Sequence, residues 1–145
     1  MKFSTRARYG TRALLDIALN AGDGLVMLKD ISARQEISKR YLEHMMTLLK
    51  KGGLVVSERG VGGGYRLARA PEDIRLDEVF EALEGGMEPV DCVADASTCE
   101  RADDCVVRLL WCDVSDAMRS VLAERTLSDL MEQSIAHDRK KGGTR

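Results

Sequence analysis

The sequence of 145 residues lacks any apolar run long enough to cross a lipid bilayer. A membrane-spanning helix needs about 20 predominantly apolar residues, and the apolar runs here cover only a few. The opening segment, MKFSTRARYG, is basic, but Asp16 interrupts the apolar residues that follow it. A secretory signal is therefore not expected. We expect a cytoplasmic protein without a membrane partner, in which thiols stay reduced.

Cysteine is absent outside residues 92–112, where four cysteines follow the spacing C-x6-C-x5-C-x6-C. They are Cys92, Cys99, Cys105 and Cys112. No C-x2-C pair, which is common in structural zinc sites, is present. Structural zinc, a thiol switch that oxidises to a disulfide, and inert buried cysteines remain as alternatives. We favour an iron–sulfur cluster held by three or four thiolates, because inert cysteines are not expected to gather in one segment.

The sequence also lacks a recognisable pair of nucleophile and base, and it has no recognisable carboxylate dyad. We therefore expect no enzymatic activity and no small-molecule substrate. The segment GVGGGY lacks the third glycine of a G-x-G-x-x-G loop, and a strand is predicted after it in place of a helix. This segment is not expected to bind a nucleotide.

The net charge of −2 conceals two halves of opposite sign. Residues 1–70 hold 13 Lys and Arg against 6 Asp and Glu, whereas residues 71–145 hold 9 against 18. With 44% apolar and 32% charged residues, the composition is that of an ordinary folded domain. A basic half beside an acidic half predicts a polyanion as the partner of the first half.

The basic half predicts three helices that include a helix-turn-helix. The first helix is expected to begin after Ser4 as its N-cap and to end near Gly22, and the second lies within MLKDISARQE. The third begins after Ser38 and ends at Gly52. In a helix-turn-helix, the N-terminal residues of the second helix of the pair reach the major groove. The candidate DNA-binding residues are Ser38, Lys39, Arg40, Tyr41 and Glu43. An acid on this face repels phosphate unless it accepts from a cytosine, so Glu43 is expected to act as a specificity gate.

A hairpin is predicted directly after the third helix, from strands over 54–57 and 65–68 around the glycine-rich loop. A hairpin in this place is the wing of a winged helix-turn-helix. Arg59 is expected at the tip of the wing, where it would enter a minor groove of double-stranded DNA. The glycines Gly60, Gly62 and Gly63 would let the backbone approach phosphate.

The acidic half predicts one helix within 71–86, then the cysteine-rich segment, then a long helix through Ala123. Asp103 and Asp104 are expected to cap the long helix and to put Cys105 in its first turn, at the positive end of the helix dipole. Its apolar stripe would suit pairing with a second copy, and it consists of Val106, Leu110, Val114, Ala117 and Val121. The residues TLSD, 126–129, predict the start of a short final helix.

These elements predict a mainly α protein with a small β-hairpin wing, built as a winged helix-turn-helix domain plus a long dimerisation helix. The expected domains are 1–86 for DNA binding and 87–104 for the cysteine-rich cluster-binding loop. Residues 105–136 are expected to form the dimerisation helix and the short C-terminal helix, and 137–145 a flexible tail.

Several motifs together resemble those of the IscR-type family of winged-helix transcription regulators, which has iron–sulfur, nitric-oxide-sensing and iron-responsive members. They are RYGTRALLDIALN, DISARQEISKRYLE, RGVGGGY, LW.D.SD and TLSDL, with three cysteines in the loop. The resemblance covers nearly the whole chain. It implies a homodimer with crossed long helices and one [2Fe-2S] or [4Fe-4S] cluster per subunit, whose state alters affinity for a double-stranded DNA operator. It further implies that Cys92, Cys99 and Cys105 are ligands, and that Glu43 and Arg59 read bases and the minor groove.

The fourth ligand departs from the family pattern. Arg108 stands three residues after the third cysteine, where IscR-type proteins place a histidine, and Arg8 lies in the region where nitric-oxide-sensing relatives use an aspartate of the second subunit. A guanidinium does not normally ligate iron. Cys112 is the obvious substitute, although about 10 Å of helix rise would separate it from Cys105, and Asp104 or a water are the other candidates. A metal-free thiol-switch regulator and a small electron-transfer protein are the alternative functions.

Overall fold

Local capping signals set the helix boundaries in the first half of the chain. In the computed structural model, which describes residues 2–142, α1 spans Thr5–Asn20, α2 spans Leu28–Gln35 and α3 spans Lys39–Lys51. The hydroxyl of Ser4 accepts from the backbone N–H of Ala7 at 3.3 Å, and the hydroxyl of Ser38 accepts from that of Tyr41 at 3.2 Å. Both predicted N-caps are therefore confirmed, and each satisfies one of the free donors at its helix start.

The wing is an antiparallel hairpin of β1 (Val55–Glu58) and β2 (Gly64–Leu67), with Val55 opposite Leu67 and Glu58 opposite Gly64. Each strand is shifted by one residue from the prediction. Leu54 belongs to the turn after α3, because its backbone N–H donates to the carbonyl of Leu49 at 3.0 Å. The side chain of Leu54 is fully buried.

One apolar core holds α1, α2, α3, α4 (Leu76–Glu84) and the base of the wing together, and the first turn of α7 (Leu127–Gly142) closes it. Its largest fully buried side chains are Leu14, Ile17, Ile31, Leu42, Met45, Met46, Leu49, Leu54, Ile74, Leu83, Leu127 and Val55. Burial of each such side chain stabilises the fold by about 1.5–3 kcal/mol. The helices α1 and α4 cross closely at Gly10, where an added Cβ would lie 2.6 Å from the side chain of Leu83.

The helices α1 to α4 and the hairpin together form what we call the winged body. The helix α7 is attached to it by its first residues. The backbone N–H of Leu127 donates to Ile74 at 2.9 Å, and that of Leu76 donates to Arg125 at 2.9 Å. The predicted capping pair is confirmed, since Asp129 accepts from the N–H of Thr126 at 2.8 Å. The helix then continues to Gly142, so the predicted end at residue 136 is wrong. Cations in its last turn interact favourably with the helix dipole, and residues 143–145 of the predicted tail lie outside the described residues.

The long helix α6 (Val106–Ala123) begins later than the sequence predicted. Its N-cap is Cys105, which has an extended backbone with φ −89° and ψ 107° and forms no side-chain cap hydrogen bond. Neither Asp103 nor Asp104 caps the helix, and the prediction that Cys105 lies in its first turn is wrong. The backbone N–H of Asp104 instead closes a turn onto the carbonyl of Arg101 at 3.2 Å, so the chain enters α6 from a turn.

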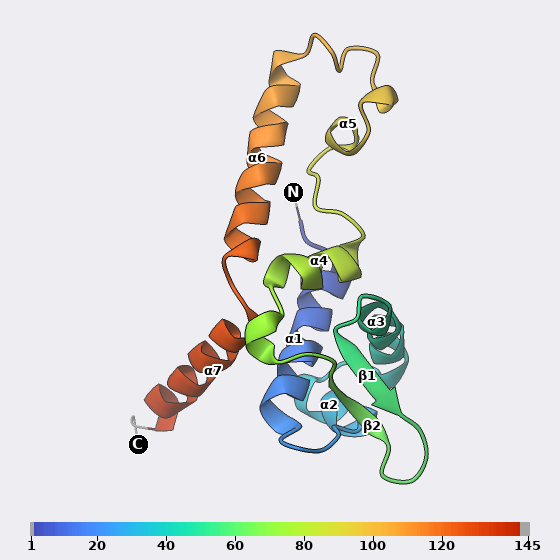
Figure 1. Cartoon of the computed structure of the whole chain (residues 1–145), viewed down its shortest axis with the longest axis vertical. Helices are drawn as coiled ribbons and strands as arrows, with labels where there is room; N and C mark the ends of the chain where they lie inside the picture. The colour runs from blue at the N-terminus through green and yellow to red at the C-terminus, as the bar shows by residue number, and fades with distance from the viewer. Residues whose placement is uncertain (1, 143–145) are drawn as a thin grey trace.

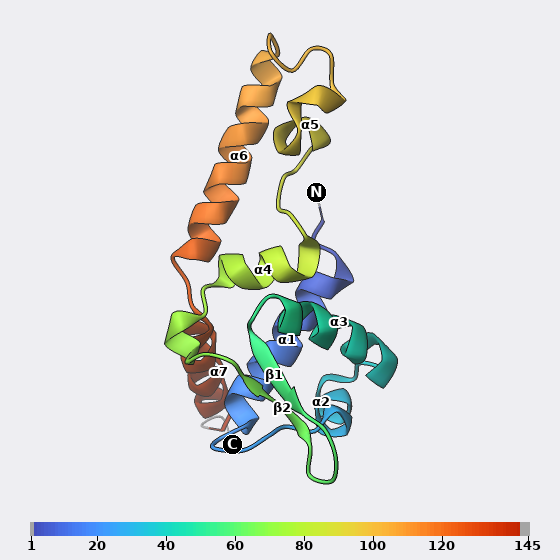
Figure 2. The same ribbon diagram turned by 45° about the vertical axis from the view of Figure 1, so that its right-hand side comes forward.

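The segment between α4 and α6 contains short turns of helix within the predicted loop. These are α5 (Asp91–Ala94) and a 3₁₀ turn, η2 (Ala96–Thr98), while another 3₁₀ turn, η1 (Pro71–Asp73), precedes α4. The carboxylate of Asp95 accepts from both the N–H and the hydroxyl of Ser97, at 3.0 and 2.8 Å, and these bonds lower its pKa. Figures 1 and 2 place α5 beside the far end of α6, while the hairpin lies at the opposite end of the molecule.

No helix among residues 2–142 is long and apolar enough to cross a membrane.

Candidate nucleic-acid interface and thiol loop

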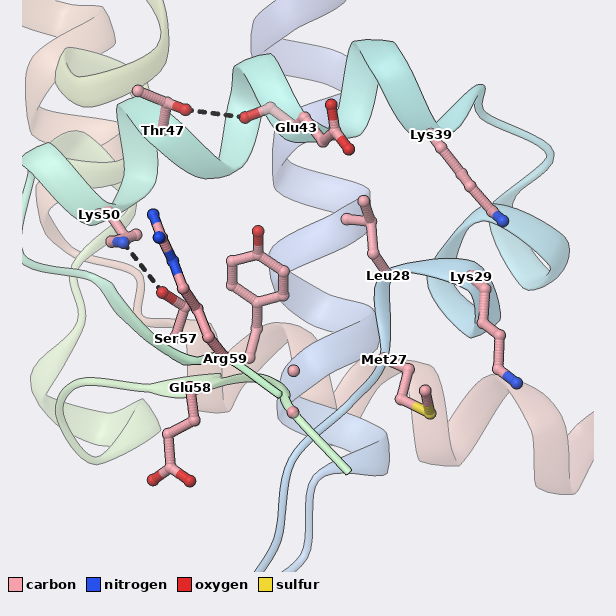
Figure 3. A pocket seen from close by; sticks show the side chains of 13 residues that line it. Met27, Leu28, Lys29, Lys39, Glu43, Thr47, Lys50, Ser57, Glu58 and Arg59 are labelled. Carbon is pink, nitrogen blue, oxygen red and sulfur yellow. Dashed lines mark hydrogen bonds between the residues drawn. The ribbon is translucent and has the colours of Figure 1, made fainter. Parts of the chain in front are cut away.

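A cleft of about 560 Å³ separates α3 from the wing (Figure 3). It is lined by Met27, Leu28, Lys29, Lys39, Glu43, Thr47, Lys50, Ser57, Glu58, Arg59, Gly63, Gly64 and Tyr65. Four of these residues are basic and two are acidic. A hollow of this kind, bounded by a helix and a hairpin and rich in cations, is suited to receive a phosphate backbone.

The first turns of α3 present most of the predicted DNA-binding residues to solvent. Ser38, Lys39, Arg40 and Glu43 are all exposed. Tyr41 differs, because it is half-buried and its hydroxyl lies 2.7 Å from the hydroxyl of Thr5 on α1. Its ring meets the ring of Tyr9 edge to face, with centroids 6.2 Å apart. Tyr41 therefore connects α3 to α1.

The turn of the wing places Arg59 differently from the prediction. Val61, which is fully exposed, occupies the tip of the turn that Gly63 closes onto Gly60 by a backbone hydrogen bond of 3.0 Å. Arg59 precedes this turn, and its side chain extends from the hairpin toward α3 (Figure 3). The expectation that Arg59 is the tip residue is wrong, because the turn is formed by residues 60–63, which follow Arg59.

The wing glycines have conformational reasons for their positions apart from any contact with DNA. Gly60 and Gly62 have φ angles of 100° and 78°, which only glycine adopts without strain. A Cβ at Gly63 would collide with the carbonyl of Glu58, and one at Gly64 would lie 2.5 Å from the carbonyl of Val26. The glycine-rich pattern is thus explained by the close backbone approach within the wing.

Two contacts join the wing to the rest of the chain, one to α3 and one to the segment between α1 and α2, and neither was expected from the sequence. Lys50 donates to the hydroxyl of Ser57 at 2.9 Å, which links α3 to β1. Tyr65 exchanges two backbone hydrogen bonds of 2.8 Å with Val26. Burial, and then the negative charge of Glu43, raise the pKa of the Tyr65 phenol. The sequence offered one signal that Lys50 belongs to this site. Lys50 lies seven residues after Glu43 and thus on the same face of α3.

The four cysteines are gathered in the loop and the first two turns of α6. Cys92 lies in α5, Cys99 follows η2, Cys105 precedes α6, and Cys112 lies within α6. All four are free thiols, and among them only Cys99 is exposed, the others being half-buried. We call residues 91–105 the thiol loop. None of the four cysteines lies in the core of the winged body or at the cleft.

The donor set of the thiol loop fits an iron–sulfur cluster by its chemistry, since thiolates are the usual ligands of such clusters. As folded, however, the described residues contain no group of three His, Cys, Asp or Glu side chains close enough to hold a metal ion. Arg108 bridges the segment, because its Nε–H donates to the carbonyl of Cys92 at 2.9 Å. Cys112 follows Arg108 by four residues and so shares its face of α6.

An ion pair connects α6 to the segment that follows α4. Arg119 forms an ion pair with Glu88, in the linker after α4, and lies 3.9 Å from the carboxylate of Glu81 on α4. The pKa of Glu88 is lowered, first by the bond from its own backbone N–H and further by Arg119, against the opposing effect of burial. The position of α6 relative to α4 is thus set in part by charged groups.

The opposite face of α6 is apolar and exposed. Its exposed residues are Val106, Val107, Leu109, Leu110 and Val121, with exposed fractions of 54 to 77%. Val114 of the predicted stripe is half-buried, and Ala117 is exposed. Because soluble monomers rarely expose several large apolar side chains side by side, this face is a candidate surface for association.

A family model described as "Rrf2: Iron-dependent Transcriptional regulator" matches residues 3–133. The chain belongs to the Rrf2 family. A curated relative, Protein rrf2 of Nitratidesulfovibrio vulgaris (strain Hildenborough), is 43% identical over 134 residues, which cover 92% of this chain and 89% of the relative.

Solved structures agree with the Rrf2 assignment. T. potens IscR has a TM-score of 0.75 at 36% identity, covering 92% of this chain and 88% of that one. CymR (YrzC), described as the global cysteine regulator of B. subtilis, has a TM-score of 0.74 at 36% identity, covering 92% and 98%. These relatives are transcription regulators and not enzymes, so the mainly α winged fold, the regulatory role and DNA binding that we predicted are confirmed.

Proposed function

We propose that this Rrf2-family regulator is a homodimer whose thiol loop holds an iron–sulfur cluster, and that the state of the cluster sets its affinity for an operator. The observation that carries the proposal is the segregation of the thiols. All four cysteines lie in the thiol loop and the start of α6, away from the core and from the α3–wing cleft. Thiols that served only for packing have no reason to avoid the core.

DNA would dock on the face formed by α3 and the wing. Lys39 and Arg40 would contact phosphate, and Glu43 would select among base edges in the major groove. Arg59 would close the other side of the cleft, since it extends from the hairpin toward α3 (Figure 3). In a symmetric dimer, two such faces would meet half-sites about one helical turn apart, 34–36 Å.

Cys92, Cys99 and Cys105 would hold the cluster, with Cys112 as the candidate fourth thiolate. The cluster would supply a group whose oxidation or loss depends on iron, oxygen or nitric oxide. The chain itself would contribute the structural connection between the thiol loop and the face that binds DNA. The thiol loop and the wing lie at opposite ends of the molecule, and α6 runs from the thiol loop to the level of α4 (Figures 1 and 2). The ion pair of Arg119 with Glu88 connects α6 to the body that carries α3.

The test is anaerobic purification followed by iron and sulfide analysis, visible absorption, and titration with operator DNA. The expected result is a coloured protein with about one cluster per chain, and a colourless Cys99→Ala variant that keeps its fold because the core contains no cysteine. Protein that contains neither iron nor sulfide, yet controls its operator normally, would contradict the cluster.

A metal-free thiol switch is the second candidate, and two observations favour it. The side chains of residues 2–142 form no group that could hold a metal ion, and one solved structure of the similar CymR of Staphylococcus aureus is described as an oxidized form. In this case, two of the thiols would lose their protons and two electrons to an oxidant such as a peroxide and would form a disulfide. Mass spectrometry after mild oxidation distinguishes the two: a loss of two mass units with altered DNA affinity, in protein without iron, supports the switch.

A further inference from the structure

We propose that Arg108 is a positioning residue that latches the Cys92 turn onto the first turn of α6. Arg108 is not expected to ligate iron, since a guanidinium has no free lone pair for a metal. The geometry gives it a different task. The inference rests on the proposed function only in treating the thiol loop as the sensing segment.

The bond closes the thiol loop at both ends. The Nε–H of Arg108 donates to the carbonyl of Cys92 at 2.9 Å across a separation of 16 residues, and both groups are partly buried. Cys99 and Cys105 lie between these two ends. Closing a loop of this length restricts the chain that carries three of the thiols, so it limits how far they can separate before any metal or oxidant arrives.

The guanidinium also keeps its positive charge beside the carbonyl of Cys92. No carboxylate forms an ion pair with Arg108 among the described residues. Its charge is therefore not neutralised locally, although Asp103 and Asp104 stand close to it in the sequence. A donor with an unpaired charge makes a stronger hydrogen bond than a neutral one.

The contact further explains the place of Cys112. The two side chains are four residues apart on one face of α6, and they are both half-buried, while the apolar face with Leu110 lies on the other side of the helix. A latch at Arg108 holds α5 over this same face. We therefore expect Cys112 to face the thiol loop, away from the surface that would pair with a second copy.

The experiment measures thiol accessibility in the full chain, reduced and treated with a chelator. Each cysteine is alkylated with iodoacetamide, and its rate is followed by peptide mass spectrometry. In Arg108→Ala, we expect Cys92 to react roughly tenfold faster, which is the effect of losing one hydrogen bond from a charged donor. Cys99 is already exposed, so its rate should stay unchanged and serves as the internal reference.

Two further variants separate the latch from a general change of charge or structure. Arg101→Ala removes the same charge from the same loop at an exposed position, and it should leave the Cys92 rate unchanged. Arg108→Lys keeps the charge and one donor, and it should restore most of the protection. Equal Cys92 rates in wild type and Arg108→Ala, or equal acceleration in Arg101→Ala, would overturn the proposal.

The same variants keep this inference distinct from the proposed cluster. After anaerobic reconstitution with Fe²⁺ and sulfide, a cluster in Arg108→Ala should be lost to a chelator roughly tenfold faster than in wild type, with an altered visible circular dichroism spectrum. If wild type takes up no iron at all, the cluster proposal fails, while the alkylation rates of the metal-free protein still decide whether Arg108 is a latch.

Discussion

At the scale of single residues, Asp16 is the buried charge on which the helix-turn-helix depends. Its side chain is 1% exposed and accepts from Arg34 at 2.9 and 2.7 Å and from Gln35 at 2.9 Å. These bonds fasten the middle of α1 to the end of α2, and so hold the element that precedes the recognition helix. The hydrogen bonds that Arg34 donates to Asp16 raise the pKa of Arg34, against the opposing effect of burial.

We expect Asp16→Asn to lower the free energy of unfolding by about 2 kcal/mol, because the amide cannot accept all three bonds and leaves the guanidinium without its counter-charge. Urea unfolding followed by circular dichroism measures the loss. The matched control is Asp23→Asn, the same change at an exposed position, for which little effect is expected. Equal losses in the two variants would contradict a structural role for the Asp16 network.

Residue-scale chemistry also explains the wing. Gly64→Ala should distort the pairing of the hairpin with Val26, because the new Cβ would lie 2.5 Å from a backbone carbonyl that cannot move aside easily. We expect a loss of about 1–3 kcal/mol in stability together with weaker operator binding. Gly24→Ala is the control, since a Cβ there would meet its nearest atom at an ordinary 3.6 Å. Unchanged stability and affinity in Gly64→Ala would show that the wing can adjust.

At the scale of elements, the joint between α6 and the winged body is electrostatic and is therefore sensitive to acid. Hydrogen bonds to the Glu88 carboxylate hold its pKa below the ordinary value of 4.5. Its contribution to stability is then fully present above about pH 4.5 and is lost as the pH falls through the lower folded-state pKa.

Glu88→Gln should therefore be less stable than wild type at pH 7, and this difference should narrow as the pH falls below 4.5, where wild type loses the same charge. Urea midpoints at several pH values from 7 to 3 test this expectation. A difference that stays constant across that range would mean that the charge of Glu88 is not what stabilises the joint.

At the scale of the whole molecule, the exposed apolar face of α6 predicts association of two copies. Leu110 is 54% exposed on this face. A lysine there would place a charge in the proposed interface, so Leu110→Lys should shift the protein from dimer to monomer while leaving the winged body folded. Sedimentation velocity measures the change. Gln133→Lys, at an exposed polar position of α7, is the control and should remain dimeric. A dimeric Leu110→Lys would exclude this face.

Most elements of the fold could be predicted from the sequence because their signals are local. Ser4 and Ser38 cap their helices through contacts within one turn, and Thr126 and Asp129 do the same for α7. The predictions failed where a local signal competed with tertiary contacts. Asp103 and Asp104 look like caps, yet the chain enters α6 from a turn closed onto Arg101. The basic last turn of α7 was read as a frayed tail, although a helix that is anchored by Leu127 can extend through it.

The sequence by itself determined the class of the protein, since the amphipathic period, the caps, the glycine-rich wing and the clustered cysteines each depend on neighbours along the chain. Only the tertiary structure decided which side chains meet. It bonds Tyr41 to Thr5, Asp16 to Arg34, Arg119 to Glu88 and Arg108 to the carbonyl of Cys92. These contacts join residues from 16 to 36 positions apart. Such pairs depend on how helices pack, which no spacing along the sequence records.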